Sequence, residues 1–400
     1  MRLCICNPHT VLGKTLFSLL FKHPHFAKYD MLLEFAKPPY KAAFVVDGTA
    51  SSLTYGSQRI PFISDNYVIM RIISTIEIYL WCLFNKINPF TQTIIFRPQT
   101  LDTKKDVLYG FAFLTDTFIN KTIYKKSAFA SFAGKRILHA SHYYSRTKKV
   151  SEVLKTMGIT IMTAEADLKK SPFFKTYFPF IKRCLIVPSV LRERYKKRIP
   201  FEKRLNRCIV MGTLFTIDKK EKGHREYTDF FKSSALHPMR KELLLNKNKL
   251  KDIMEIRIFP LEQMNSENFQ NIRGLIKRIF WAQKNTYHSF DIVEEYNKYQ
   301  MFIAPEESIG LPTVSFIEGM ACGCAFIGLK SPIYADLGMI DTTHYIGYDG
   351  TLTDLRKKIE YYRKNPEVLK KIAENGTQFV KKRFAQKTIM NNFWKEVSEL

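Results

Sequence analysis

The stretch that decides the fold is "MFIAPEESIGLPTVSFIEGMACGCAFIGL", residues 301–329. Its first five residues are apolar and typical of a β-strand, and the segment "TVSFIEGMACG" predicts a helix after a short loop. The apolar run at 324–329 predicts a second strand. A strand, a helix and a second strand in this order indicate a parallel sheet, because the helix carries the chain back to the edge where the first strand began.

The same alternation extends along the whole chain. Further β-rich runs lie at 2–6, 42–47, 93–98, 136–141, 159–164, 208–215, 255–261 and 344–349. Helical patterns separate them, which predicts an α/β fold with two doubly wound, Rossmann-like domains facing a central cleft. The segment around 185–205 has two prolines and a dense basic run, and it predicts an interdomain linker. We therefore expect one domain at 1–190 and a second at 206–382.

The charge is strongly basic and unevenly distributed. Lys and Arg number 63 against 37 Asp and Glu, a net charge of +26. Residues 1–200 hold 31 basic and 12 acidic side chains, so most of the excess lies in the first half. Such a field attracts phosphate-rich partners. A basic nucleic-acid-binding protein is one alternative, but the sequence has no arginine-rich stripe, RNP-like motif or zinc-ligand spacing.

Cysteine usage and hydropathy predict a cytoplasmic location. The seven cysteines include two C-x-C pairs and no C-x-x-C pair, which favours buried free thiols in a reducing compartment. No signal-peptide pattern is present. The apolar stretch at 68–87 is interrupted by Arg71, Glu77 and Lys86, and its uncharged run is far shorter than the roughly 20 residues of a membrane span. It predicts a buried or interfacial amphipathic helix.

The loop at 305–312 combines acids with a tight turn. Glu306 and Glu307 precede Gly310, whose lack of a side chain lets the backbone approach a ligand closely. Carboxylates at such a turn can accept hydrogen bonds from the hydroxyls of a sugar, and a helix N-terminus favours phosphate. Together these features describe a nucleotide sugar. Alternatively, Ser315 and Glu318 have capping-box spacing, and Glu318 would then only satisfy a helix amide.

The segment "PEESIGLP…FIEGMACGCAFIG" resembles the donor-binding motif of retaining glycosyltransferases with the GT-B fold, the group 1 family that includes bacterial phosphatidylinositol mannosyltransferases. The family signature is Glu, seven residues, Glu, around a Gly-Leu-Pro-like loop. Residues 383–400 also resemble its last helix, which crosses back onto the first domain. The spacing departs from the family pattern, because Gly310 stands eight positions before Glu318.

The resemblance implies roles for the residues of the motif. Glu307, with Glu306 as the alternative, would bind the hexose hydroxyls, and Glu318 would bind the ribose. The residues of the turn between these acids would also bind the donor: Gly310, Leu311 and Pro312.

The family's phosphate clamp, an Arg and a Lys, is only partly present in this chain. Gly212 is kept and Thr213 stands at the position of the Arg. Lys219, Lys220 and Lys222 are therefore the candidates to contact the diphosphate, with Lys222 in the catalytic role. His142 would lie near the transferred sugar, with His139 as the second choice.

The sequence therefore predicts a hexosyltransferase that uses a nucleoside-diphosphate sugar and retains its configuration. The acceptor is expected to be a saccharide or lipid-linked saccharide in the assembly of surface polysaccharide. The basic first domain would hold the acceptor, at times on the inner face of the cell membrane. No metal or other cofactor is expected. The alternative within enzymes is an inverting CMP-sugar transferase of the same fold that uses His237-Pro238.

Overall fold

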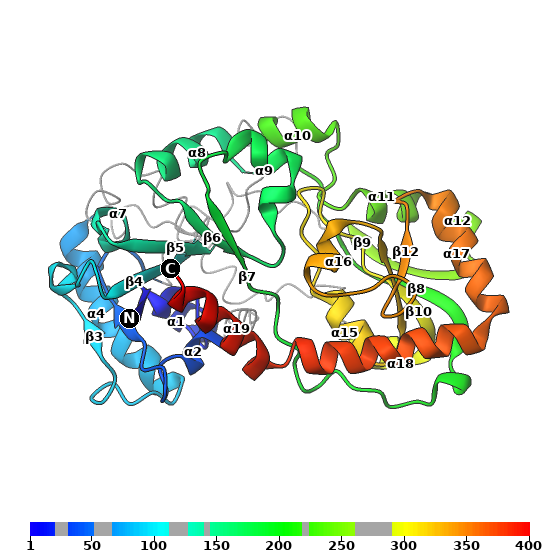
Figure 1. Cartoon of the computed structure of the whole chain (residues 1–400), viewed down its shortest axis with the longest axis horizontal. Helices are drawn as coiled ribbons and strands as arrows, with labels where there is room; N and C mark the ends of the chain where they lie inside the picture. The colour runs from blue at the N-terminus through cyan, green and yellow to red at the C-terminus, as the bar shows by residue number, and fades with distance from the viewer. Residues whose placement is uncertain (21–30, 52–65, 112–126, 140–144, 218–223, 261–289) are drawn as a thin grey trace.

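The computed structural model describes residues 1–20, 31–51, 66–111, 127–139, 145–217, 224–260 and 290–400 (Figure 1). The chain builds two parallel sheets, one from each half (Figure 1). Helices pack against both, so the strands are buried and read as nearly continuous apolar runs.

The first sheet has seven strands: β1 (Arg2–Cys6), β2 (Ala43–Val45), β3 (Ile94–Ile95), β4 (Asp106–Phe111), β5 (Lys135–His139), β6 (Ile161–Ala164) and β7 (Arg183–Ile186). Their spatial order is β3-β2-β1-β4-β5-β6-β7, and every pairing is parallel. The strand order reverses between β1 and β4. This is the topological switch point of the sheet, where doubly wound folds bind ligands.

The second sheet has five strands: β8 (Leu205–Leu214), β9 (Met254–Pro260), β10 (Tyr299–Ile303), β11 (Ala325–Leu329) and β12 (Ile346–Tyr348). Their order is β12-β11-β10-β8-β9, again with parallel pairings throughout. Here the order reverses between β8 and β10. The loop at 304–314 leaves β10 at that point, so the quoted stretch occupies the switch point of the second sheet.

The helices of the first half are α1 (Leu16–Leu20), α2 (Met31–Glu34), α4 (Tyr67–Phe84), α7 (Ala128–Ser131), α8 (Thr147–Thr156) and α9 (Pro172–Tyr177). Those of the second half are α10 (Arg225–Phe231), α11 (Pro238–Leu245), α12 (Lys247–Leu250), α14 (Ile292–Lys298), α15 (Ser315–Ala321), α16 (Pro332–Asp336), α17 (Leu352–Lys364), α18 (Pro366–Arg383) and α19 (Gln386–Ser398). Short 3-10 turns are η1 (Pro8–Thr10), η5 (Pro98–Thr100), η7 (Leu168–Lys170) and η8 (Phe201–Lys203).

The last helix returns to the first half of the chain. In Figure 1, α18 lies along the second sheet and α19 continues to the first, ending beside α2 and β7. The ring of Phe393 packs edge-on against Phe35 and Tyr109, and the Tyr40 hydroxyl donates to Asn391 at 2.8 Å. Two doubly wound sheets in series, with a final helix that crosses back, form the GT-B fold. The predicted fold class is confirmed.

The two halves also touch on the side opposite α19. Phe173 of α9 contacts the rings of Tyr227, Phe230 and Phe231 on α10. Lys170 forms an ion pair with Asp336 near these rings. The aromatic contacts bury apolar area from both halves, so they hold the second sheet in a defined position against the first.

Strands β4 and β7 differ from the sequence expectations, whereas the cysteines agree with them. Strand β4 lies next to β1 at the centre of its sheet, although the sequence analysis assigns no strand there. Strand β7 extends into the segment predicted as linker, which in the structure begins after Ile186. All seven cysteines are free thiols, and only Cys184 is not fully buried.

Candidate functional site

A buried cation lies at the switch point of the second sheet. Arg240, on α11, is only 6% exposed and donates from Nη1 to the carbonyl oxygen of Thr213 at 2.9 Å. Its guanidinium packs against Gly212, where an added Cβ would lie 2.9 Å from the Arg240 Cζ. A larger residue at Gly212 would therefore displace the guanidinium. No motif in the sequence marks Arg240 as a site residue.

Glu306 is an internal residue of the loop after β10. It is 8% exposed, and its Oε1 accepts hydrogen bonds from the Leu329 amide at 2.9 Å and from the Tyr334 hydroxyl. Burial raises the pKa of Glu306, while these two donors and the charge of Arg240 oppose that rise. The carboxylate thus ties the loop to β11 and α16.

Glu307 begins the tight turn and is half-buried. Its amide donates to the Leu311 carbonyl, and its own carbonyl accepts from the Gly310 amide, both at 2.9 Å. Gly310 has a φ of +90°, a left-handed conformation that favours glycine. A Cβ at Gly310 would lie 3.7 Å from Ser171 in the first half, so the turn faces the other domain. Of the other turn residues, Leu311 is buried in the apolar cluster between the halves, and Pro312 is also buried.

Glu318 lies on α15 and pairs with the segment that joins the two sheets. Its Oε1 accepts from Nη2 of Arg192 at 2.5 Å, and Arg192 also donates to the Tyr195 hydroxyl at 3.1 Å. The capping-box alternative is not observed, because Val314 precedes the helix and no side chain caps it. The Glu318 side chain is 7% exposed, so little of it remains open to solvent.

The start of α15 differs from the predicted anion site. The helix spans seven residues, and the amides of Phe316, Ile317 and Glu318 already donate to the carbonyl oxygens of Thr313 and Val314, the two residues that precede the helix. These amides are therefore occupied within the turn. A phosphate group at this position would therefore have to be bound by cationic side chains.

His237 borders the same switch point. It is 7% exposed and directly precedes α11, and burial together with the nearby Arg240 lowers its pKa to about 3. Its ring interacts with the backbone at Pro305 and Glu306, which acts in the opposite direction on the pKa. His237 is therefore neutral at physiological pH and packs against the loop that follows β10.

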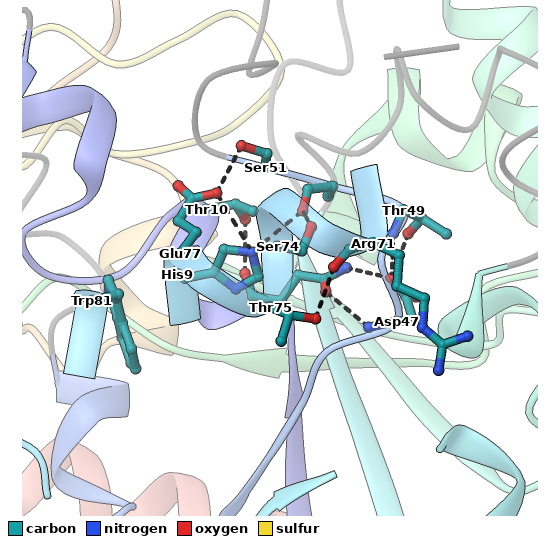
Figure 2. Close-up of polar contacts among 12 residues, drawn as sticks. His9, Thr10, Asp47, Thr49, Ser51, Arg71, Ser74, Thr75, Glu77 and Trp81 are labelled. Atoms are coloured by element: carbon teal, nitrogen blue, oxygen red, sulfur yellow. Dashed lines mark hydrogen bonds and ion pairs between the residues drawn. The ribbon is translucent and has the colours of Figure 1, made fainter. Parts of the chain in front are cut away.

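A second polar cluster lies at the switch point of the first sheet (Figure 2). Asp47, two residues after β2, accepts from Asn7 Nδ2 at 2.9 Å and from the Ala128 amide at 2.8 Å. Its Oδ1 also accepts from the Thr49 amide at 2.9 Å. Asp47 thus joins the ends of β1 and β2 to α7. The signal for this residue was available in the sequence, since Asp47 ends the apolar run at 42–47.

His9 belongs to the same cluster and is completely buried (Figure 2). Its Nε2 lies 3.3 Å from the Ala50 carbonyl oxygen and 3.9 Å from Oε2 of Glu77 on α4. The Ser51 hydroxyl donates to the same Glu77 oxygen at 2.7 Å. Burial lowers the pKa of His9, and Glu77 partly opposes that effect. The sequence analysis did not select this histidine–carboxylate pair, whose members are far apart in the chain.

Four of the predicted site residues lie outside the described residues: His142, Lys219, Lys220 and Lys222. The second-choice histidine, His139, lies within β5, where it is buried and shares a hydrogen bond of 3.0 Å with Thr163. In the part of the chain that the structure describes, no group of three or more His, Cys, Asp or Glu side chains is arranged to hold a metal ion.

One family model and several solved structures are similar to this chain. Residues 216–399 match the model of glycosyl transferase family 90, which is slightly under half of the chain. No curated protein matches. Among solved structures, HepE of Anabaena, crystallised with UDP-glucose, aligns over 100% of both chains at 11% identity with a TM-score of 0.48. A glycosyltransferase from Rickettsia africae aligns over 100% of this chain and 98% of its own, at 13% identity and a TM-score of 0.48.

The family match, together with the GT-B arrangement, makes the chain a glycosyltransferase by class of activity. This agrees with the class of enzyme that the sequence predicts. The matched region contains the loop after β10, α11 and α15, so it includes Arg240, Glu307 and Glu318.

Proposed function

We propose that the protein transfers a hexose from a nucleoside-diphosphate sugar to a saccharide or lipid-linked saccharide, with retention of configuration. The observation that carries the proposal is the position of Arg240 at the switch point of the second sheet. There a buried cation lies beside the strand end at Gly212 and Thr213 and near the acids of the donor loop.

Arg240 is the side chain best suited to bind the diphosphate among those that the structure describes at this switch point. A guanidinium has five N–H donors in a rigid fork that matches phosphate oxygens, and it stays charged at all physiological pH values. Burial strengthens its interaction with an anion, because water screens the charge less. During transfer, negative charge grows on the leaving diphosphate, and Arg240 would stabilise that charge.

In this proposal Glu306 has a structural role, whereas Glu307 and Glu318 bind the donor. Glu306 is committed to Leu329 and Tyr334, so it shapes the loop. Glu307 is half-buried on the turn that faces the first domain, a position suited to hydroxyls of the transferred hexose. Glu318 accepts from Arg192 through one carboxylate oxygen, and its carboxylate would also accept from a ribose hydroxyl.

The first domain would hold the acceptor. The cluster of His9, Asp47 and Glu77 marks its switch point, which is where the fold places a ligand. The excess of basic residues in this half favours an acceptor with phosphate groups, such as a lipid-linked saccharide.

Calorimetric titration of the purified chain with UDP, GDP and CMP tests the proposal. A diphosphate should bind, and Arg240→Gln should weaken it by about 10- to 150-fold, the effect of losing a hydrogen bond to a charged group. Arg207→Gln is the matched control, because Arg207 donates to Lys251 and Met254 at the opposite end of the same sheet. The affinity of the Arg207→Gln variant for the nucleoside diphosphate should equal that of the parent chain.

Two results would overturn this reading. Binding of none of these nucleotides would remove nucleotide-sugar transfer altogether. Binding of CMP in preference to the diphosphates, with Arg240→Gln unaffected, would favour the inverting CMP-sugar transferase that uses His237.

A further inference from the structure

One face of helix α4 packs into the core of the first domain. Trp81, Ile78 and Cys82 are completely buried there, and the Trp81 indole donates to the Leu12 carbonyl at 2.6 Å. The Ser74 hydroxyl donates to the Ala50 carbonyl at 2.7 Å, as seen in Figure 2. These contacts fix the helix against the sheet, and its rotation about its own axis is therefore defined.

The opposite face of α4 is apolar and open to solvent. Its side chains recur every three or four residues, so they form one stripe along the helix. We call it the outer stripe: Val68 (64% exposed), Ile72 (56%), Ile76 (57%), Tyr79 (39%) and Leu83 (62%). Phe90, which is 91% exposed, extends beyond the end of the helix. A run of exposed apolar side chains of this length marks an interaction surface.

Cationic side chains flank the outer stripe. Arg71 and Lys86 are exposed on α4 and directly after it. Lys14 lies at the same end, since its backbone exchanges hydrogen bonds with the Asn85 side chain at 2.8 and 3.0 Å. Arg97 follows Phe96, whose ring stacks on Tyr79 with 6.1 Å between centroids.

Acidic side chains do not oppose these cations along the helix. The acid of α4 is Glu77, which is 1% exposed and accepts from Ser51. An apolar stripe with cations on its border, in the more basic half of the chain, is complementary to a surface with an apolar interior and anionic headgroups.

We propose that the outer stripe docks α4 flat on an anionic lipid surface, with its apolar side chains among the acyl chains and the flanking cations at the headgroups. By length and composition α4 is the one helix among the described residues that could cross a membrane. Its inner face, however, is packed in the domain core with Trp81 and Glu77 hydrogen-bonded there, so crossing would require the first domain to unfold. The proposal does not rest on the donor site.

Cosedimentation of the full chain with vesicles tests the proposal. The chain should bind vesicles rich in phosphatidylglycerol and bind pure phosphatidylcholine weakly, and salt should reduce binding because exposed charges are screened. The double substitution Ile72→Glu/Ile76→Glu should reduce the partition coefficient at least about tenfold, since charged side chains oppose entry into the acyl region. Arg71→Gln/Lys86→Gln should lower binding to the anionic vesicles alone.

Leu245→Glu is the matched control, because Leu245 is 75% exposed on α11, in the other domain, and its substitution should leave vesicle binding unchanged. All these positions are exposed, so melting temperatures should stay close to that of the parent chain. Equal binding by the parent and by Ile72→Glu/Ile76→Glu would overturn the proposal. A dimer in solution that this double variant dissociates, with no vesicle binding by the parent, would assign the stripe to a second copy of the chain instead.

Discussion

The guanidinium of Arg192 donates to the Glu318 carboxylate at 2.5 Å, joining the segment between the two sheets to α15. Glu318 is nearly buried, whereas the Arg192 side chain is 43% exposed. The Tyr195 ring lies beneath Arg192, with 5.2 Å from its centroid to the Arg192 Cζ. A nucleotide that reaches Glu318 therefore meets a carboxylate whose orientation is already set by the linker.

Glu318→Gln should weaken binding of UDP by about 10-fold or more, because ribose would lose a charged acceptor. Arg192→Gln removes the partner but leaves the carboxylate in place, and it should have a smaller effect on affinity. Isothermal titration calorimetry of both variants measures the difference. If the two substitutions weaken UDP equally, Glu318 serves as an anchor for the linker and does not contact the ribose.

Glu306→Gln and Glu307→Gln should affect different properties. Glu306 holds Leu329 and Tyr334, so its substitution should lower the free energy of unfolding by about 1–3 kcal/mol. Glu307→Gln should affect stability less than Glu306→Gln, because Glu307 is only half-buried, and it should weaken the intact donor more than the free nucleotide.

Urea denaturation and ligand titration distinguish the two acids. Loss of donor affinity in Glu306→Gln, at unchanged stability, would assign the hexose to Glu306.

His237 should make the protein sensitive to acid. Its pKa is lowered to about 3 by burial and Arg240, whereas the unfolded chain protonates this residue near its ordinary value of 6.5. The unfolded state therefore binds one more proton as the pH falls below 6.5, and stability is lost in that direction. Relative to His237→Gln, the parent chain should lose on the order of 2 kcal/mol between pH 7 and pH 5. Parallel pH profiles of the two chains in urea would contradict this.

Transfer should proceed without a divalent metal, and the product should keep the anomeric configuration of the donor. Arg240 lies at the switch point of the second sheet, where it would stabilise the leaving diphosphate in the proposed reaction. Activity measured with and without EDTA checks the first expectation, and NMR of the product's anomeric proton checks the second. An inverted product would remove the retaining mechanism and leave the glycosyltransferase class intact.

Much of the architecture follows from local patterns in the sequence. The strand at 301–305, the helix after it and the strand at 324–329 appear as β10, α15 and β11, because apolar runs and small residues encode them locally. Strand β4 is an exception. It is buried on both faces, so its pattern does not alternate, and Gly110 interrupts a run whose Val107, Tyr109 and Phe111 favour a strand.

The sequence by itself determined the parallel α/β class and the acidic turn around Gly310, since both depend on residues close together in the chain. Only the tertiary structure decided which acid faces inward, because Glu306 and Glu307 are adjacent and differ solely in what packs around them. It also decided the partners of the site. Arg192 pairs with Glu318 across 126 positions, and Arg240 joins Thr213 across 27. Such pairs form when strand order brings distant segments to one switch point, and no local pattern in the sequence records that order.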